Sequence, residues 1–140
     1  MRFGVFIVYM LISVQTVAQF IEHTEEGYEM MRVYYGGGSY YLDQQQRKAL
    51  QEWLSSTENL HEYEILLQSH TDNIGSHAYN LFLSQMRSES VIEALGEIHI
   101  AREEIRIEDF GEDAPTFDNN TWQGRLNNRR VDVILVPPSF

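Results

Sequence analysis

An acidic and a basic residue stand on either side of a strand-to-helix turn in the middle of this chain. Asp72 follows an apolar run that ends at Gln68, and Arg87 lies further along in a long helical pattern. An acid at a strand end facing an arginine on the next helix can clamp a ligand that carries both an ammonium and a carboxylate. The same two residues can equally form an ordinary ion pair between strand and helix. Their types and order leave both interpretations open.

Asn80 belongs to the same group of polar residues. It precedes Arg87 by almost two helical turns, so the two residues share one helix face about 10 Å apart. Further along, Arg129 and Arg130 stand next to each other before the last apolar run. On a strand-like segment they point opposite ways, so one can reach a carboxylate ligand while the other pairs with a neighbouring acid.

The elements that must position these residues are predicted from apolar periodicity. Asp43 and Gln46 form a start like a capping box, and Leu50, Trp53 and Leu54 follow on one helix face. Runs rich in Val, Ile, Leu and Tyr indicate strands at 31–35, 63–68, 105–110 and 131–136. Helices are expected from Asp43 to 55–57 and over 76–95. This order predicts an α/β two-layer sandwich, with helices packed on one face of a mixed βαβαββ sheet.

The longer helix has one face that looks like the core face. Its members recur at spacings of three and four: Tyr79, Leu83, Met86, Ser90 and Ala94. Asn80, Ser84, Arg87 and Val91 form the adjacent stripe. We therefore expect Arg87 near the border between core and solvent.

Composition bounds the classes of function. With 43% hydrophobic and 12% aromatic residues, the chain has the material for one folded domain. Its formal charge of −11 disfavours nucleic acid as a partner, because phosphate binding needs a basic surface. The absence of cysteine excludes disulfides, thiolate metal sites and a lipid anchor on an N-terminal cysteine.

The first residues have the pattern of a signal peptide. Arg2 precedes an apolar run at 3–14, and small residues at 16–18 provide a cleavage site. We expect a signal peptide at 1–18, an acidic lead-in at 19–30 and one domain at 31–137, with the mature protein outside the cytoplasm. The alternative is an uncleaved N-terminal anchor.

Catalytic and cofactor chemistry finds little support. His70, Asp72 and His77 are the conceivable metal ligands, but no His-Glu-x-x-His motif or second cluster completes a site. The chain has no Gly-x-Ser-x-Gly elbow and no Ser-x-x-Lys pair, and its glycines at 36–38 lack the lysine and hydroxyl of a phosphate loop. We expect no enzyme, no cofactor and no metal.

A longer set of ordered matches resembles a known family. It runs His70-Thr71-Asp72-Asn73-x-Gly75, Tyr79-Asn80-x-x-Leu83-Ser84-x-x-Arg87, Phe110-Gly111-Glu112 and Gly124-Arg125-x-x-Asn128-Arg129-Arg130-Val131. This pattern is similar to the signature of the OmpA-like peptidoglycan-binding domain, the type found in OmpA, Pal and MotB, and spans roughly Val33 to Val136.

The resemblance implies a site and a ligand. It implies non-covalent binding of the diaminopimelate in the peptidoglycan stem peptide. Asp72 would accept hydrogen bonds from the ammonium, and the guanidinium of Arg87 would donate two hydrogen bonds to the carboxylate. Asn80 and Arg129 match positions that line the same groove, while Thr71, Asn73 and Asn128 match positions that shape the loop. It further implies a periplasmic module associated with the outer membrane. The alternative is a scaffold subunit, bound to an outer-membrane or envelope-complex protein, that no longer holds the wall.

Overall fold

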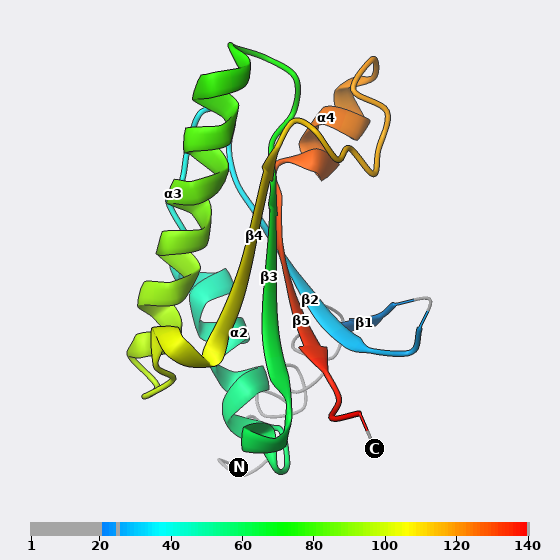
Figure 1. The fold of residues 1–140 in the computed structure, drawn as a ribbon. Helices are drawn as coiled ribbons and strands as arrows, with labels where there is room; N and C mark the ends of the chain where they lie inside the picture. The colour runs from blue at the N-terminus through cyan, green and yellow to red at the C-terminus, as the bar shows by residue number, and fades with distance from the viewer. Residues whose placement is uncertain (1–20, 25, 140) are drawn as a thin grey trace, which may run out of the picture.

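The computed structural model describes residues 21–24 and 26–139 (Figure 1). The predicted signal peptide at 1–18 lies outside the described residues. In the described part of the chain, no helix is both long enough and apolar enough to cross a lipid bilayer.

A five-stranded mixed sheet forms the centre of the fold, with strand order β1-β2-β5-β3-β4. β3 and β4 run parallel, and the other neighbours are antiparallel. This confirms the predicted α/β class. The strands are β1 (Ile21–His23), β2 (Glu29–Tyr34), β3 (Glu64–His70), β4 (Ile105–Gly111) and β5 (Arg130–Val136).

Two long helices, α2 (Gln44–Ser56) and α3 (His77–Gly96), lie on one side of the sheet (Figure 1). The main core forms between them and the inward-facing strand residues, including Val33, Leu67 and Val133. Leu66, next to Leu67, points to the opposite face and packs there with Met30 and Ile134. Alternation along β3 therefore buries its unbroken apolar run on both faces, as a central strand requires.

Side-chain caps fix where the helices begin. Asp43 Oδ1 accepts from the backbone N–H of Gln46 at 2.9 Å, and Ser76 Oγ accepts from that of Tyr79 at 3.1 Å. These caps satisfy N–H groups that have no partner inside a helix. Both helix starts agree with the predicted positions.

The predicted core face of α3 is confirmed only in part. Leu83 and Ala94 are buried as predicted, but Tyr79 is 43% exposed, and Asn80 and Arg87 of the adjacent stripe are buried as well. A polar stripe can be buried only when it finds hydrogen-bond partners, and apolar periodicity does not reveal such partners. Arg87 consequently lies inside the fold, not at the border with solvent.

The sequence prediction missed a short strand and a short α-helix. β1 lies within the expected acidic lead-in, where Ile21 pairs with Met31 of β2. The other is α4 (Trp122–Asn128), which lies where a loop and a strand-like segment were expected. With seven residues and a cap from Thr121 Oγ1 to the N–H of Gly124 at 2.9 Å, α4 is too short to show apolar periodicity.

Candidate functional site

A cavity of about 350 Å³ lies at the end of the sheet where β3 stops and α3 starts, the upper end in Figure 1. The loop after β2 and the end of α4 complete its wall. Its lining comprises Gly37, Gly38, Thr71, Asp72, Ile74, Gly75, Tyr79, Leu83, Arg87 and Arg129. The fold thus brings Asp72, Arg87 and Arg129 to one cavity.

Asp72 is held by two contacts just past the end of β3. Its Oδ1 accepts from the backbone N–H of Ile74 at 3.0 Å, and its Oδ2 accepts from Nε of Arg129 at 2.6 Å. Both side chains are less than one tenth exposed. An ionised carboxylate has about four acceptor positions, so Asp72 retains capacity for a ligand donor.

Arg87 is the most enclosed charged group of the cavity, with no exposed surface. Its Nε, Nη1 and Nη2 donate to the carbonyl oxygens of Ser39, His70 and Gly36 at 2.8, 3.0 and 3.1 Å. A guanidinium carries five N–H groups, so two remain after these bonds. Burial lowers the pKa of Arg87 to about 10, with the nearby Asp72 acting against the shift, so the group stays positive at neutral pH.

Tyr35 contacts both the guanidinium and the main chain of Arg87. Its ring centroid lies 5.1 Å from Cζ of Arg87, and its hydroxyl donates to the Arg87 carbonyl oxygen at 3.2 Å. Burial raises the pKa of Tyr35 to about 12. The phenol is therefore neutral at physiological pH and does not neutralise the guanidinium.

The glycine run after β2 lets the backbone approach the two arginines. A Cβ at Gly37 would lie 3.3 Å from Cζ of Arg129, and Gly38 has a φ of +66° that favours glycine. The carbonyl of Gly36 meets Arg87 directly. Gly37 and Gly38 therefore form a wall of the cavity.

The remaining predicted residues lie at different distances from the cavity. Thr71 lines it, and its hydroxyl donates to the carbonyl oxygen of Asp72 at 2.8 Å. Asn80 is buried behind the lining, where Nδ2 donates to Glu112 Oε2 at 3.2 Å and Oδ1 has no protein partner. Asn73 is exposed outside the lining.

Asn128 forms hydrogen bonds to the loop before α4. Its Nδ2 donates to the carbonyl oxygen of Phe117 and to Oδ1 of Asn119, both at 2.8 Å, and its Oδ1 accepts from the N–H of Phe117 at 3.1 Å. These bonds fix the course of the loop, so Asn128 positions the segment that carries Arg129.

The two adjacent arginines diverge. Arg129 reaches Asp72, whereas Arg130 is buried on the other side, with Nε 2.9 Å from Oδ1 of Asp132. The opposite directions agree with the prediction. Arg129, however, meets an acid of the protein itself, which the sequence did not indicate.

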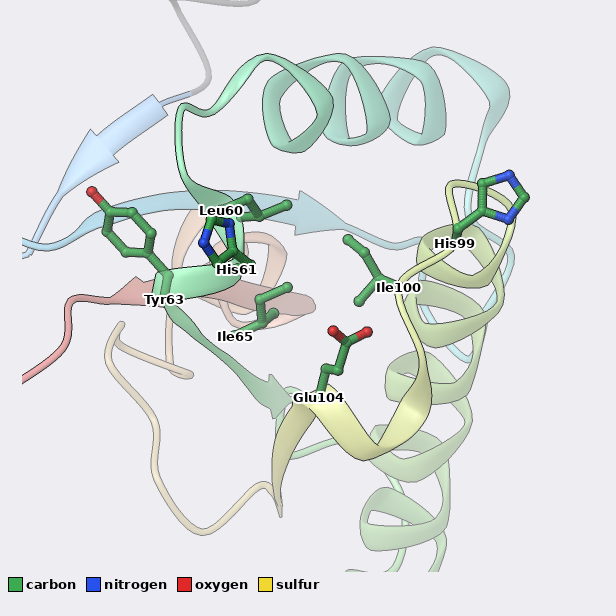
Figure 2. Close-up of a pocket in the computed structure, with 7 residues that line it drawn as sticks. All are labelled: Leu60, His61, Tyr63, Ile65, His99, Ile100 and Glu104. Carbon is green, nitrogen blue, oxygen red and sulfur yellow. The ribbon is translucent and has the colours of Figure 1, made fainter.

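A second cavity, of about 460 Å³, lies at the other end of β3 (Figure 2). Leu60, Ile65 and Ile100 contribute apolar side chains to it, and Glu104 contributes its one acidic group. Its lining among residues 21–24 and 26–139 includes no arginine or lysine, so in this part of the chain it lacks the acid–base pair of the first cavity. Among the described residues, no group of three or more histidines and acids has the arrangement of a metal site.

Comparison with known proteins finds relatives in sequence. Over 72 residues the chain is 39% identical to the outer-membrane lipoprotein YfiB of Pseudomonas aeruginosa, a match that covers 51% of this chain and 43% of that protein. It is 31% identical over 70 residues to the peptidoglycan-associated lipoprotein of Legionella pneumophila, covering 50% of this chain and 40% of that one. The chain thus spans less than half the length of these relatives.

Solved structures share the fold. The peptidoglycan-associated lipoprotein from Burkholderia pseudomallei superposes with a TM-score of 0.68 at 28% identity, covering 74% of this chain and 88% of that one. The cell wall anchor of the T6SS from Pseudomonas aeruginosa, at 20% identity, has the same TM-score of 0.68 over 90% of this chain and 94% of its own, which shows the fold alone.

Residues 34–129, most of the described chain, match the OmpA family. This range contains Asp72, Arg87 and Arg129 together with the elements that position them. Motif, fold and family match coincide over the same residues, and the chain therefore belongs to the OmpA family.

Proposed function

We propose that this chain binds peptidoglycan non-covalently, through the diaminopimelate of the stem peptide. The observation that carries the proposal is that Asp72 and Arg87 both line one cavity of about 350 Å³. Diaminopimelate carries an ammonium and a carboxylate on one carbon, so it needs an acid and a base at short range. Members of the OmpA family are structural or peptidoglycan-binding proteins, and a catalytic role is not proposed.

In this proposal each charged group of the cavity has a role. Asp72 accepts from the ligand ammonium with the lone pairs that Ile74 and Arg129 leave free. Arg87 donates its two remaining N–H groups to the ligand carboxylate. Both are charge-assisted hydrogen bonds, which are stronger than hydrogen bonds between neutral groups.

The charge of the cavity supports an anionic group in the ligand. Two guanidiniums, of Arg87 and Arg129, face one carboxylate, of Asp72, so the lining is net positive. The whole chain, by contrast, has a formal charge of −11. A positive cavity in an acidic protein directs an anionic ligand to that one place.

A second candidate function has its own supporting observation. Asp72 already pairs with Arg129, and Arg87 already bonds three carbonyl oxygens, as an ordinary structural network would. Under this alternative the domain is a scaffold subunit bound to an outer-membrane or envelope-complex protein, and it does not hold the wall.

Sedimentation with purified wall sacculi separates the two functions. Asp72→Asn removes the charge but keeps the shape, and we expect a loss of binding of about 10- to 100-fold, the value of one charge-assisted bond. Asp113→Asn is the matched control, because Asp113 is an exposed acid outside the cavity that contacts His77. Absence of wild-type retention supports the scaffold instead, whereas equal retention of wild type and folded Asp72→Asn contradicts the role proposed for Asp72.

The proposed place of action is the periplasm, in association with the outer membrane. The relatives include outer-membrane lipoproteins and porins, consistent with a place in the cell envelope. We propose the division into a signal peptide at 1–18, a lead-in at 19–30 and a domain at 31–137. Mass spectrometry of the protein recovered from cells tests it: a mature N-terminus at Gln19 is expected, and an intact Met1 contradicts cleavage.

A further inference from the structure

Trp122, the first residue of α4, presents an exposed ring beside the cavity. Its side chain is 61% exposed, unlike the other tryptophan, Trp53, which is buried in the core. Cζ of Arg129 lies 5.3 Å from the indole centroid, and Cζ of Arg125 lies 5.8 Å from it. Cation–π contacts with two arginines thus hold a large apolar ring in the solvent.

The ring has a defined place relative to the proposed ligand. Arg129, which contacts the indole, also pairs with Asp72 at 2.6 Å. Trp122 therefore stands one side chain away from the acid proposed to receive the ammonium. The cavity itself is lined by two further exposed apolar side chains, Ile74 and Tyr79, which are 58% and 43% exposed.

The chemistry of such a ring limits what it can bind. An exposed tryptophan held in place loses little conformational freedom when a ligand covers it. Its flat apolar face suits a flat ligand that has C–H bonds on one side and polar groups around the edge. A pyranose sugar has that form, and the guanidinium of Arg125, with its Cζ 5.8 Å from the ring centroid, carries N–H groups of the kind that donate to sugar hydroxyls.

We propose that Trp122 forms a saccharide subsite next to the cavity, and that it stacks on an amino sugar of the glycan strand. This inference rests on the proposed function, since it assumes that diaminopimelate occupies the cavity. In a stem peptide two residues separate the sugar from diaminopimelate, and two extended residues span about 7 Å before the diaminopimelate side chain adds to the reach. One arginine side chain separates Trp122 from Asp72, a spacing of the same order.

Calorimetry with two synthetic probes tests the subsite on the mature protein. One probe is the stem tripeptide that ends in diaminopimelate, and the other is the same tripeptide attached to N-acetylmuramic acid. We expect wild type to bind the sugar-bearing probe at least fivefold more tightly. Trp122→Ala should abolish this difference and leave the affinity for the bare tripeptide within about twofold. Tyr41→Ala, which removes another exposed aromatic that does not line the cavity, should keep the difference.

Fluorescence gives a second readout that a purely structural role would not move. Only Trp122 among the two tryptophans is exposed, so the sugar-bearing probe should change its emission and the bare tripeptide should change it less. Equal affinity of wild type for both probes overturns the subsite while the proposed function stands. Equal weakening of both probes by Trp122→Ala shows that the ring acts only through Arg129 and also overturns it. If neither probe binds, the proposed function fails and the subsite fails with it.

Discussion

Nε of Arg129 lies 2.6 Å from Oδ2 of Asp72, and this contact joins the end of β3 to the end of α4 in the wall of the cavity. Both side chains are buried, so the pair is shielded from solvent and from salt. Asp72 thus stays next to a cation when the cavity is empty, and a ligand ammonium must share the carboxylate with Arg129.

A double-mutant cycle measures this pair. Asp72→Asn and Arg129→Gln should each lower the free energy of unfolding, and the double variant should lose less than their sum. We expect a coupling of about 1–3 kcal/mol from urea denaturation, because the two residues touch and are buried. The exposed pair Glu89 and Arg102 is the control, with an expected coupling smaller than that of the buried pair. Equal coupling in both pairs contradicts the role given to burial.

Arg87 should be a main determinant of stability as well as of binding. Arg87→Ala leaves the carbonyl oxygens of Gly36, Ser39 and His70 without this donor in a buried place. We expect a loss of roughly 3 kcal/mol or more in the free energy of unfolding, measured by urea denaturation. Lys48→Ala, at an exposed helix position, should change it by less than about 0.5 kcal/mol.

Arg87→Lys separates charge from geometry. Lysine keeps the positive charge but has a single nitrogen, so it cannot reach three carbonyl oxygens as the guanidinium fork does. We expect stability between wild type and Arg87→Ala. Stability of Arg87→Lys equal to that of wild type would show that charge alone accounts for the role of Arg87.

His70 should make stability depend on pH. Burial, and then the nearby Arg130, lower its pKa from the ordinary 6.5 to about 4, while Asp132 acts in the opposite direction. As pH falls from 6.5 to 4, the unfolded chain takes up the proton and the folded chain does not, so the folded state loses stability. The stability present above pH 6.5 should fall by up to about 3 kcal/mol near pH 4.

The measurement is the free energy of unfolding at several pH values for wild type and for His70→Gln, which does not titrate there. The difference between the two curves should be flat above pH 6.5 and should change between pH 6.5 and 4. His99→Gln, at an exposed histidine, is the control variant. A constant difference across the whole range would show that His70 does not contribute.

Gly124 should tolerate no side chain. A Cβ there would overlap the carbonyl oxygen of Asp118, which is backbone and cannot move aside cheaply. We expect Gly124→Ala to destabilise the protein by about 2 kcal/mol or more in thermal and urea unfolding. Gly96→Ala meets no atom within 4 Å and lies at the end of α3, so it should be neutral or stabilise by up to about 1 kcal/mol. Similar effects of both substitutions would rule out the steric explanation.

Periodicity and turn residues in the sequence were enough to predict the mixed sheet and the two long helices. The run at 65–67 indicated a buried central strand, and Asp43 and Ser76 marked the helix starts, because these signals act within one or two turns of the chain. The order of matched residues also placed Asp72, Arg87 and Arg129 in one candidate site, and the fold brings these three to a single cavity.

Only the tertiary structure decided which face of α3 is buried and what each charged group contacts. The interior position of Asn80, Ser84 and Arg87 depends on hydrogen-bond partners that are distant in sequence. These partners lie in β3, in β4, in the loop after β4 and in the loop after β2. Arg129 meets Asp72 because seven residues of α4, without an apolar pattern of their own, turn it toward the end of β3. The sequence determines which residues carry charge, but long-range packing determines how these charges are paired, because the partners meet only when the chain is folded.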